Sequence, residues 1–142
     1  MHAAGCMQIA RILAQKRNLN VDLASVCGML HDIQVIITGS YKDHAKQGAI
    51  VAEKILREIG EFSDEEITTI TNAVAHHSEK EIYTEYPYTE LVKDADVFDC
   101  SLYKNAEGFY KIHKLPHIFE EYVKRIKEVR KELSLSEDEP FR

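Results

Sequence analysis

Apolar residues along this chain recur at helical spacing, and no stretch alternates with the period of two that a half-buried β-strand requires. One stripe has the i, i+3, i+4, i+7 pattern of a buried helical face: Leu23, Val26, Cys27 and Leu30. Similar stripes occupy further stretches, at about residues 3–16, 44–59, 64–77, 91–102 and 117–133. The sequence therefore predicts an all-α protein, a compact single-domain bundle of about six helices.

The segments between the stripes contain residues typical of turns. Gly39 and Gly108 predict loops at 34–43 and 105–116, and Pro87 is expected to break the chain after a polar loop at 79–88. We expect one domain over residues 1–133, followed by a polar, loosely held C-terminal tail at 134–142.

Composition and charge limit the partners. The net charge of −6 argues against a nucleic-acid polymer or an anionic membrane, since both need a basic surface on the protein. A small phosphorylated substrate is compatible with this charge, because bound cations can supply positive charge locally. No apolar run approaches about 18 residues, so we expect no membrane span. An oligomer is left open.

The cysteines and the start of the chain bear on localisation. The chain has three cysteines, far apart and inside apolar stripes, so we interpret them as reduced core thiols rather than disulfide partners or metal ligands. No signal-peptide pattern is present, and we expect a cytoplasmic protein. His2 stands at the second position, which leaves open whether a segment precedes it.

Histidines and aspartates adjoin the apolar faces of several expected helices: His2, His31, Asp32, His44, His77, and Asp94 or Asp96. Taken singly, each of these histidines is better explained as a core or surface residue with a hydrogen-bond partner, whereas the whole set is better explained as a metal site. Ligands that converge in a bundle core are a known way to build a metal site. This number of nitrogen and oxygen ligands suits one or two divalent ions with a bridging carboxylate, and is too many for one structural zinc.

The order of these residues resembles the HD superfamily of metal-dependent phosphohydrolases. The matching elements are His2, His31-Asp32, His44, His76-His77 and Asp96. The string Leu30-His31-Asp32-Ile33 is similar to the motif of the superfamily, and His44 is similar to the additional histidine of its two-metal members. The resemblance covers about the first two-thirds of the chain.

The resemblance implies a role for each matching residue. His2, His31, Asp32 and Asp96 would hold a first ion, with Asp94 as the alternative to Asp96. Asp32, as the expected catalytic residue, would bridge to a second ion. The remaining ligands of the second ion would be His44 and either His76 or His77. The metal is left open among Mn, Fe, Mg, Co, Ni and Zn.

Two departures limit what the resemblance implies about substrate. Many two-metal members continue the His-Asp motif with Gly-Lys, whereas Gln34-Val35 follows here. The branch that hydrolyses cyclic di-GMP has a Gly-Tyr-Pro signature after its double histidine, which residues 78–87 lack. We therefore carry over neither substrate contact.

The activity that the resemblance implies is hydrolysis of a phosphate ester, monoester or diester, in a nucleotide or another small phosphorylated metabolite. A metal ion would lower the pKa of a coordinated water, which then attacks phosphorus. Four lysines flank the ligand-bearing segments and would either contact phosphate or be solvated: Lys42, Lys46, Lys80 and Lys93. The alternatives are a di-iron oxygenase with the same ligands, and a regulatory metal-binding domain without catalysis.

Overall fold

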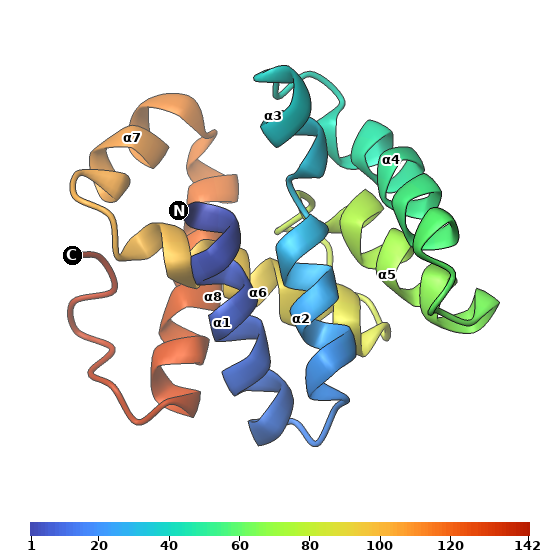
Figure 1. Cartoon of the computed structure of the whole chain (residues 1–142). Coiled ribbons are helices and arrows are strands. Elements are labelled where there is room, and N and C mark those ends of the chain that lie inside the picture. The colour runs from blue at the N-terminus through green and yellow to red at the C-terminus, as the bar shows by residue number, and fades with distance from the viewer.

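The computed structural model describes residues 1–142 and consists of eight α-helices with no β-strand (Figure 1). The helices are α1 His2–Lys16, α2 Val21–Leu30, α3 Ile33–Thr38, α4 His44–Ile59, α5 Asp64–His76, α6 Pro87–Ser101, α7 Ala106–His113 and α8 Pro116–Glu132. The prediction of an all-α, compact single domain is confirmed.

Two short helices lie in segments that the sequence predicted to be loops. α3 falls inside residues 34–43, and Gly39 ends it in the left-handed conformation with φ 70°. α7 falls inside residues 105–116 and contains Gly108, around which a side chain would meet no atom within 4 Å. Gly39 is thus a helix cap, and Pro87 begins α6 rather than breaking the chain, since the first turn needs no N–H donor.

α6 is the central helix and contacts α1, α2, α5, α7 and α8. Its buried residues lie on more than one face and include the apolar Leu91, Val92, Ala95, Val97 and Phe98. Figure 1 shows α4 and α5 side by side at one side of the molecule and α7 and α8 at the other, with α1, α2 and α6 between them. The core therefore surrounds the helix that carries Asp96.

Glycines bring α1 close to its neighbours. A methyl group added at Gly28 in α2 would lie 3.0 Å from the Cα atom of Met7 in α1. One added at Gly5 in α1 would lie 2.0 Å from a carboxylate oxygen of Asp99 in α6. The first turns of α1 can thus approach the end of α2 and the last turns of α6, which places His2 near both.

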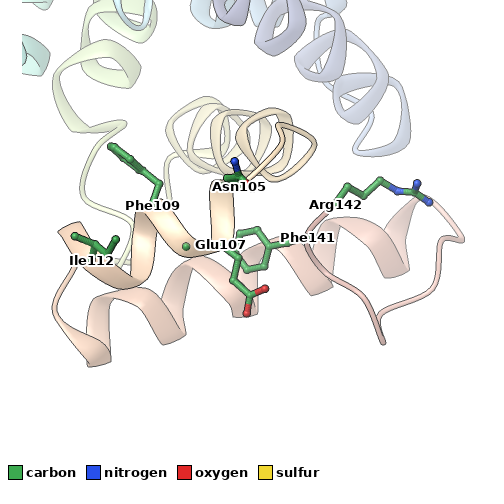
Figure 2. Close-up of a pocket in the computed structure, with 8 residues that line it drawn as sticks. Asn105, Glu107, Phe109, Ile112, Phe141 and Arg142 are labelled. Carbon is green, nitrogen blue, oxygen red and sulfur yellow. The ribbon is translucent and has the colours of Figure 1, made fainter.

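The tail at 134–142 was expected to be loosely held, but it packs against the domain. The ring of Phe141 stacks on Phe119 with centroids 6.0 Å apart, and the amide of Arg142 donates to the Ser101 carbonyl at 3.0 Å. Together with α7, the tail lines a hollow of about 590 Å³ (Figure 2). The tail contains two large apolar residues, Leu135 and Phe141, and Phe141 packs against the core.

The expectation that no apolar run approaches 18 residues was wrong. The window Val21–Thr38 has a mean hydropathy of 1.4 and, by length and composition, is apolar enough to cross a membrane. In the structure this window is not one helix, since α2 ends at Leu30 and α3 begins at Ile33. His31 and Asp32 lie at the break.

Candidate metal centre

The structure brings six of the predicted ligand residues together. His2 begins α1, His31 and Asp32 join α2 to α3, and His44 begins α4. His77 directly follows α5, and Asp96 lies within α6. Their ring nitrogens and carboxylate oxygens form overlapping groups whose atoms lie within 4.8 Å of one another. Each of these groups could hold a metal ion.

A first subsite is formed by His2, His31, Asp96 and one oxygen of Asp32. The Nε2 atom of His2 lies 3.1 Å from Nε2 of His31 and 3.1 Å from Oδ1 of Asp96. Oδ2 of Asp32 lies 3.5 Å from Nε2 of His31 and 3.8 Å from Nε2 of His2.

A second subsite is formed by His44, His77 and the other oxygen of Asp32. Oδ1 of Asp32 lies 3.4 Å from Nε2 of His44 and 3.3 Å from Nε2 of His77. The two Nε2 atoms lie 3.2 Å apart. The two oxygens of Asp32 thus face different pairs of histidines, as a bridging carboxylate between two ions requires.

Hydrogen bonds fix which nitrogen of each imidazole faces the subsites. Nδ1 of His31 donates to the Gly28 carbonyl at 2.7 Å, and Nδ1 of His77 donates to the Val74 carbonyl at 2.7 Å. Both carbonyls lie in the last turn of a helix, where carbonyls lack an intrahelical partner. Nδ1 of His44 donates to the Tyr41 carbonyl at 2.9 Å. Each neutral ring then presents the lone pair of Nε2 to its subsite.

The contact between His44 and His77 tests whether a metal fits. Because Nδ1 carries the proton of each neutral ring, both Nε2 atoms are acceptors, and neither can donate across the 3.2 Å between them. Two nitrogens bound to one ion at about 2.0–2.1 Å lie roughly 3 Å apart when the angle at the metal is near 90°. The second subsite therefore fits a divalent ion better than a hydrogen bond.

Burial and neighbouring charge set the protonation of the first subsite. Burial lowers the pKa of His31 to about 4, so the ring is neutral at pH 7 and able to bind metal. Burial alone would lower the pKa of His2 as well, but hydrogen bonds to Asp96 and Asp99 raise it well above its ordinary value. A metal ion at this subsite would have to displace the proton from His2.

The two carboxylates remain ionised despite their burial. Burial alone would raise the pKa of Asp32, but the adjacent imidazoles of His77 and His31 lower it. Burial opposes ionisation of Asp96 in the same way, and the adjacent Lys80 ammonium outweighs it, so the pKa lies well below its ordinary value. Both groups are therefore in the form that binds cations.

The two alternatives that the sequence left open lie outside the cluster. His76 is the last residue of α5, its side chain is 45% exposed, and its Nδ1 donates to Glu79 at 2.9 Å. Asp94 forms ion pairs with Arg17 and Arg125, each at 2.8 Å. The geometry thus favours His77 and Asp96 as the ligands.

Three residues at the centre were not predicted to support the metal ligands: Asp99 and Cys100 were given no role there, and Lys80 was expected to contact phosphate or be solvated. Oδ2 of Asp99 accepts a 2.6 Å hydrogen bond from Nδ1 of His2, and Lys80 contacts Asp96. The Cys100 thiol lies 3.7 Å from Oδ1 of Asp96, so this cysteine, which packs against the core as predicted, also borders the centre. The spacing of Asp96 and Asp99, three apart on one helix, is the signal that could have identified Asp99.

The four flanking lysines divide into two pairs. Lys42 and Lys46 are exposed, and Lys46 lines a hollow of about 280 Å³ together with Tyr41 and His44. Lys80 and Lys93 are fully buried and hydrogen-bonded within the protein, so they are neither solvated nor free to contact phosphate.

A second hollow adjoins the centre on the side of Cys100. It measures about 330 Å³ and is lined by Cys100, Tyr103, Lys104, Asn105, Ala106, Phe109 and Tyr110. The hollow of about 280 Å³ is lined by His44, and the hollow of about 330 Å³ is lined by Cys100. Both residues belong to the groups that could hold a metal ion, so the two hollows flank the cluster. The hollow between α7 and the tail shares no residue with the cluster.

Comparisons with known proteins identify relatives that are named as ribonucleases. The chain is 34% identical over 128 residues to Ribonuclease Y of Rhodopirellula baltica, and 35% identical over 102 residues to Ribonuclease Y of Fervidobacterium nodosum. These matches cover 90% and 70% of this chain, but only 21% and 18% of the relatives. The chain therefore spans about a fifth of the length of the curated relatives it matches.

These relatives correct one prediction. We expected no nucleic-acid polymer as a partner because of the net charge of −6, and relatives named as ribonucleases contradict that expectation. The charge argument failed because overall charge does not describe a site where bound cations meet the phosphate.

Structural and family comparisons agree on the fold. A predicted HD superfamily hydrolase from an uncultured Thermotogales bacterium superposes with a TM-score of 0.61 at 21% identity, covering 94% of this chain and 76% of the other. The family model described as HD domain matches residues 1–101, which include every residue of the cluster. The chain belongs to the HD domain family.

Proposed function

We propose that this chain is a metal-dependent phosphohydrolase domain that cleaves phosphodiester bonds in RNA at a two-ion centre. The first subsite would hold one ion through His2, His31, Asp32 and Asp96, and the second would hold another through Asp32, His44 and His77. The observation that carries the proposal is Asp32, whose two oxygens face separate pairs of Nε2 atoms. RNA replaces the small metabolite of the initial prediction because the relatives are named Ribonuclease Y.

The residues of the chain prepare the centre for this chemistry. Divalent ions bound here would lower the pKa of a coordinated water and neutralise charge on the phosphate oxygens. His31 stays neutral through burial, and Asp99 holds the proton on Nδ1 of His2, so that Nε2 of each ring faces the subsite. Asp32 would be a ligand of both ions, and both would neutralise charge on the phosphate group of the substrate.

The surroundings of the centre support a single-stranded substrate. Tyr41 and Phe109 are exposed aromatic residues in the two flanking hollows, and Tyr103 is a third. Lys46 and Lys104 lie in the same hollows. Nucleic-acid bases stack on aromatic rings without regard to sequence, while lysines attract the backbone, so these features suit an RNA strand that crosses the centre.

The proposal is tested by incubating the protein, loaded with Mn²⁺, with a fluorescently labelled single-stranded RNA and separating the products on a denaturing gel. We expect cleavage that stops on chelation of the metal. Asp32→Asn keeps the size of the side chain but removes its charge, and we expect it to leave the RNA intact. Intact RNA in the presence of metal-loaded wild-type protein would refute the proposed substrate.

Two small chromogenic substrates distinguish phosphodiesterase activity from phosphomonoesterase activity. Bis(p-nitrophenyl) phosphate reports on diester hydrolysis, and p-nitrophenyl phosphate reports on monoester hydrolysis. We expect the diester to be the better substrate of the Mn²⁺-loaded protein. Preference for the monoester, with no diester cleavage, would contradict the phosphodiesterase assignment while leaving a phosphohydrolase.

A further inference from the structure

Lys80 is a buried cation beside the proposed metal centre that the chemistry above does not use. It lies in the loop after α5, three residues beyond His77, and is only 1% exposed. Its Nζ atom donates to Oδ2 of Asp96 at 2.6 Å and also to the carbonyl of His77. One side chain therefore joins a residue of the first subsite to a residue of the second.

The contact with Lys80 limits how Asp96 can bind a metal. Oδ2 is engaged by the ammonium group, whereas Oδ1 faces Nε2 of His2 at 3.1 Å and Nε2 of His31 at 3.8 Å. An ion in the first subsite would thus meet one oxygen of Asp96 rather than two. Metal ligands are commonly oriented in this way by hydrogen bonds from outside the ligand shell.

The loop that carries Lys80 is itself held from α8. Nε of Arg125 donates to the Lys80 carbonyl at 2.7 Å, and its Nη2 atom donates to the Ile82 carbonyl at 3.1 Å. Arg125 also pairs with Asp94 of α6 at 2.8 Å. α8 lies beyond the residues 1–101 that match the family model, so this support comes from outside the matched region.

We infer that Lys80 is a positioning residue of the metal centre: it restricts Asp96 to one ligand oxygen and ties it to the backbone of His77. The inference rests on the proposed metal centre. It assigns to the loop after α5, and through Arg125 to α8, a role in setting the coordination of the first ion.

Lys93 provides a matched control. It is also fully buried, and its Nζ atom donates to one backbone carbonyl, that of Ile82 at 2.6 Å, and to one carboxylate, that of Glu90 at 3.0 Å. Glu90 is not a member of the metal-binding groups. Lys80→Met and Lys93→Met thus remove the same kinds of contact, but only Lys80→Met affects a proposed ligand.

The experiment compares wild type, Lys80→Met and Lys93→Met by titration with Co²⁺, reading visible absorption and affinity. For Lys80→Met we expect affinity at the first subsite to fall about 10–100-fold. We also expect weaker absorption bands, because a freed Asp96 carboxylate adds a second oxygen and raises the coordination number. Lys93→Met should match wild type in both readings. If Lys80→Met does not fold, Lys80→Gln takes its place with the same expectation.

The possible failures are distinguishable. Wild-type protein that binds no Co²⁺ would overturn the metal centre and this inference together. Wild-type protein that binds Co²⁺, with a Lys80 variant that binds as tightly or more tightly and shows the wild-type spectrum, would overturn the inference alone.

Discussion

His31 and His77 occupy equivalent positions in two different helix ends. Each directly follows its helix, and each donates from Nδ1 to the carbonyl three residues earlier. The stripe of Ile70 and Val74 predicted that His77 points inward, but the choice between His76 and His77 depended on where α5 ends. That boundary shifts by one or two residues with small changes in capping, so the sequence alone left it open.

The choice between the two histidines is testable with paired variants. We expect His77→Ala to lose one bound ion per chain, because it removes a nitrogen from the second subsite. His76→Ala should retain the wild-type metal content, since its ring contacts only Glu79. Elemental analysis after loading with Mn²⁺ and gel filtration measures the content. Equal loss of metal in both variants would contradict the assignment.

Asp99 acts through His2 in our account. Replacing it with asparagine weakens the hydrogen bond to Nδ1 of His2, and we expect Mn²⁺ affinity to fall about 10–100-fold. Glu79→Gln, which changes the carboxylate partner of His76, is the matched control and should bind Mn²⁺ as wild type does. Competition with a chelating dye gives both affinities. Unchanged affinity in Asp99→Asn would show that Asp99 does not orient His2.

At the scale of the elements, helical periodicity predicted the long helices because each buries one apolar face. It did not predict α3 and α7, which are six and eight residues long. α3 has no buried residue and α7 has only Tyr110, and both helices are shorter than the roughly 11 residues over which helical periodicity is detected. Gly39 was a correct signal for the end of a helix, whereas Gly108 lies inside α7, and we interpreted both as signs of loops.

The approach of α2 to α1 at Gly28 gives a prediction at this scale. We expect Gly28→Ala to destabilise the fold by about 1–3 kcal/mol, because the added methyl group would meet the backbone of Met7 at 3.0 Å. Gly108→Ala adds the same group inside α7 with open space around it, and should stabilise by up to about 1 kcal/mol. Urea denaturation of the metal-free proteins measures both changes. Equal stability of the two variants would contradict the close packing of α1 on α2.

At the scale of the whole molecule, the fold class and most of the candidate site could be predicted, but the substrate could not. The ligand residues were detectable because they adjoin apolar stripes on separate helices. The ion pair between Lys80 and Asp96, by contrast, joins residues 16 positions apart and leaves no periodic signal in the sequence. Net charge misled the prediction of the partner because a metal site can attract phosphate in an acidic protein.

The buried centre should also make the stability of the metal-free protein depend on pH. The unfolded chain protonates His31 near pH 6.5, whereas the folded protein does so only near pH 4. His31 therefore contributes fully above pH 6.5, and about 3 kcal/mol of stability is lost as the pH falls from 6.5 to 4. Because the pKa of His2 is raised in the folded protein, its contribution to stability does not change below pH 6.5. Because the pKa of Asp32 is lowered, its contribution to stability is lost only below pH 3.8.

Urea denaturation between pH 7 and 4.5, with a chelator present, measures this dependence. The matched variant is His31→Asn, which removes the titrating ring, and we expect its stability to fall less steeply over the same range. Identical slopes for wild type and His31→Asn would contradict the burial of a neutral imidazole at this position.

The central claim is that two ions share Asp32. The most direct measurement is a crystal structure of the protein soaked in Mn²⁺, with the anomalous signal used to locate the metal. We expect two peaks on the order of 3.5–4 Å apart, one beside each oxygen of Asp32, with His31 bound to the first ion and His77 to the second. A single peak, or peaks that do not contact Asp32, would contradict the two-ion centre.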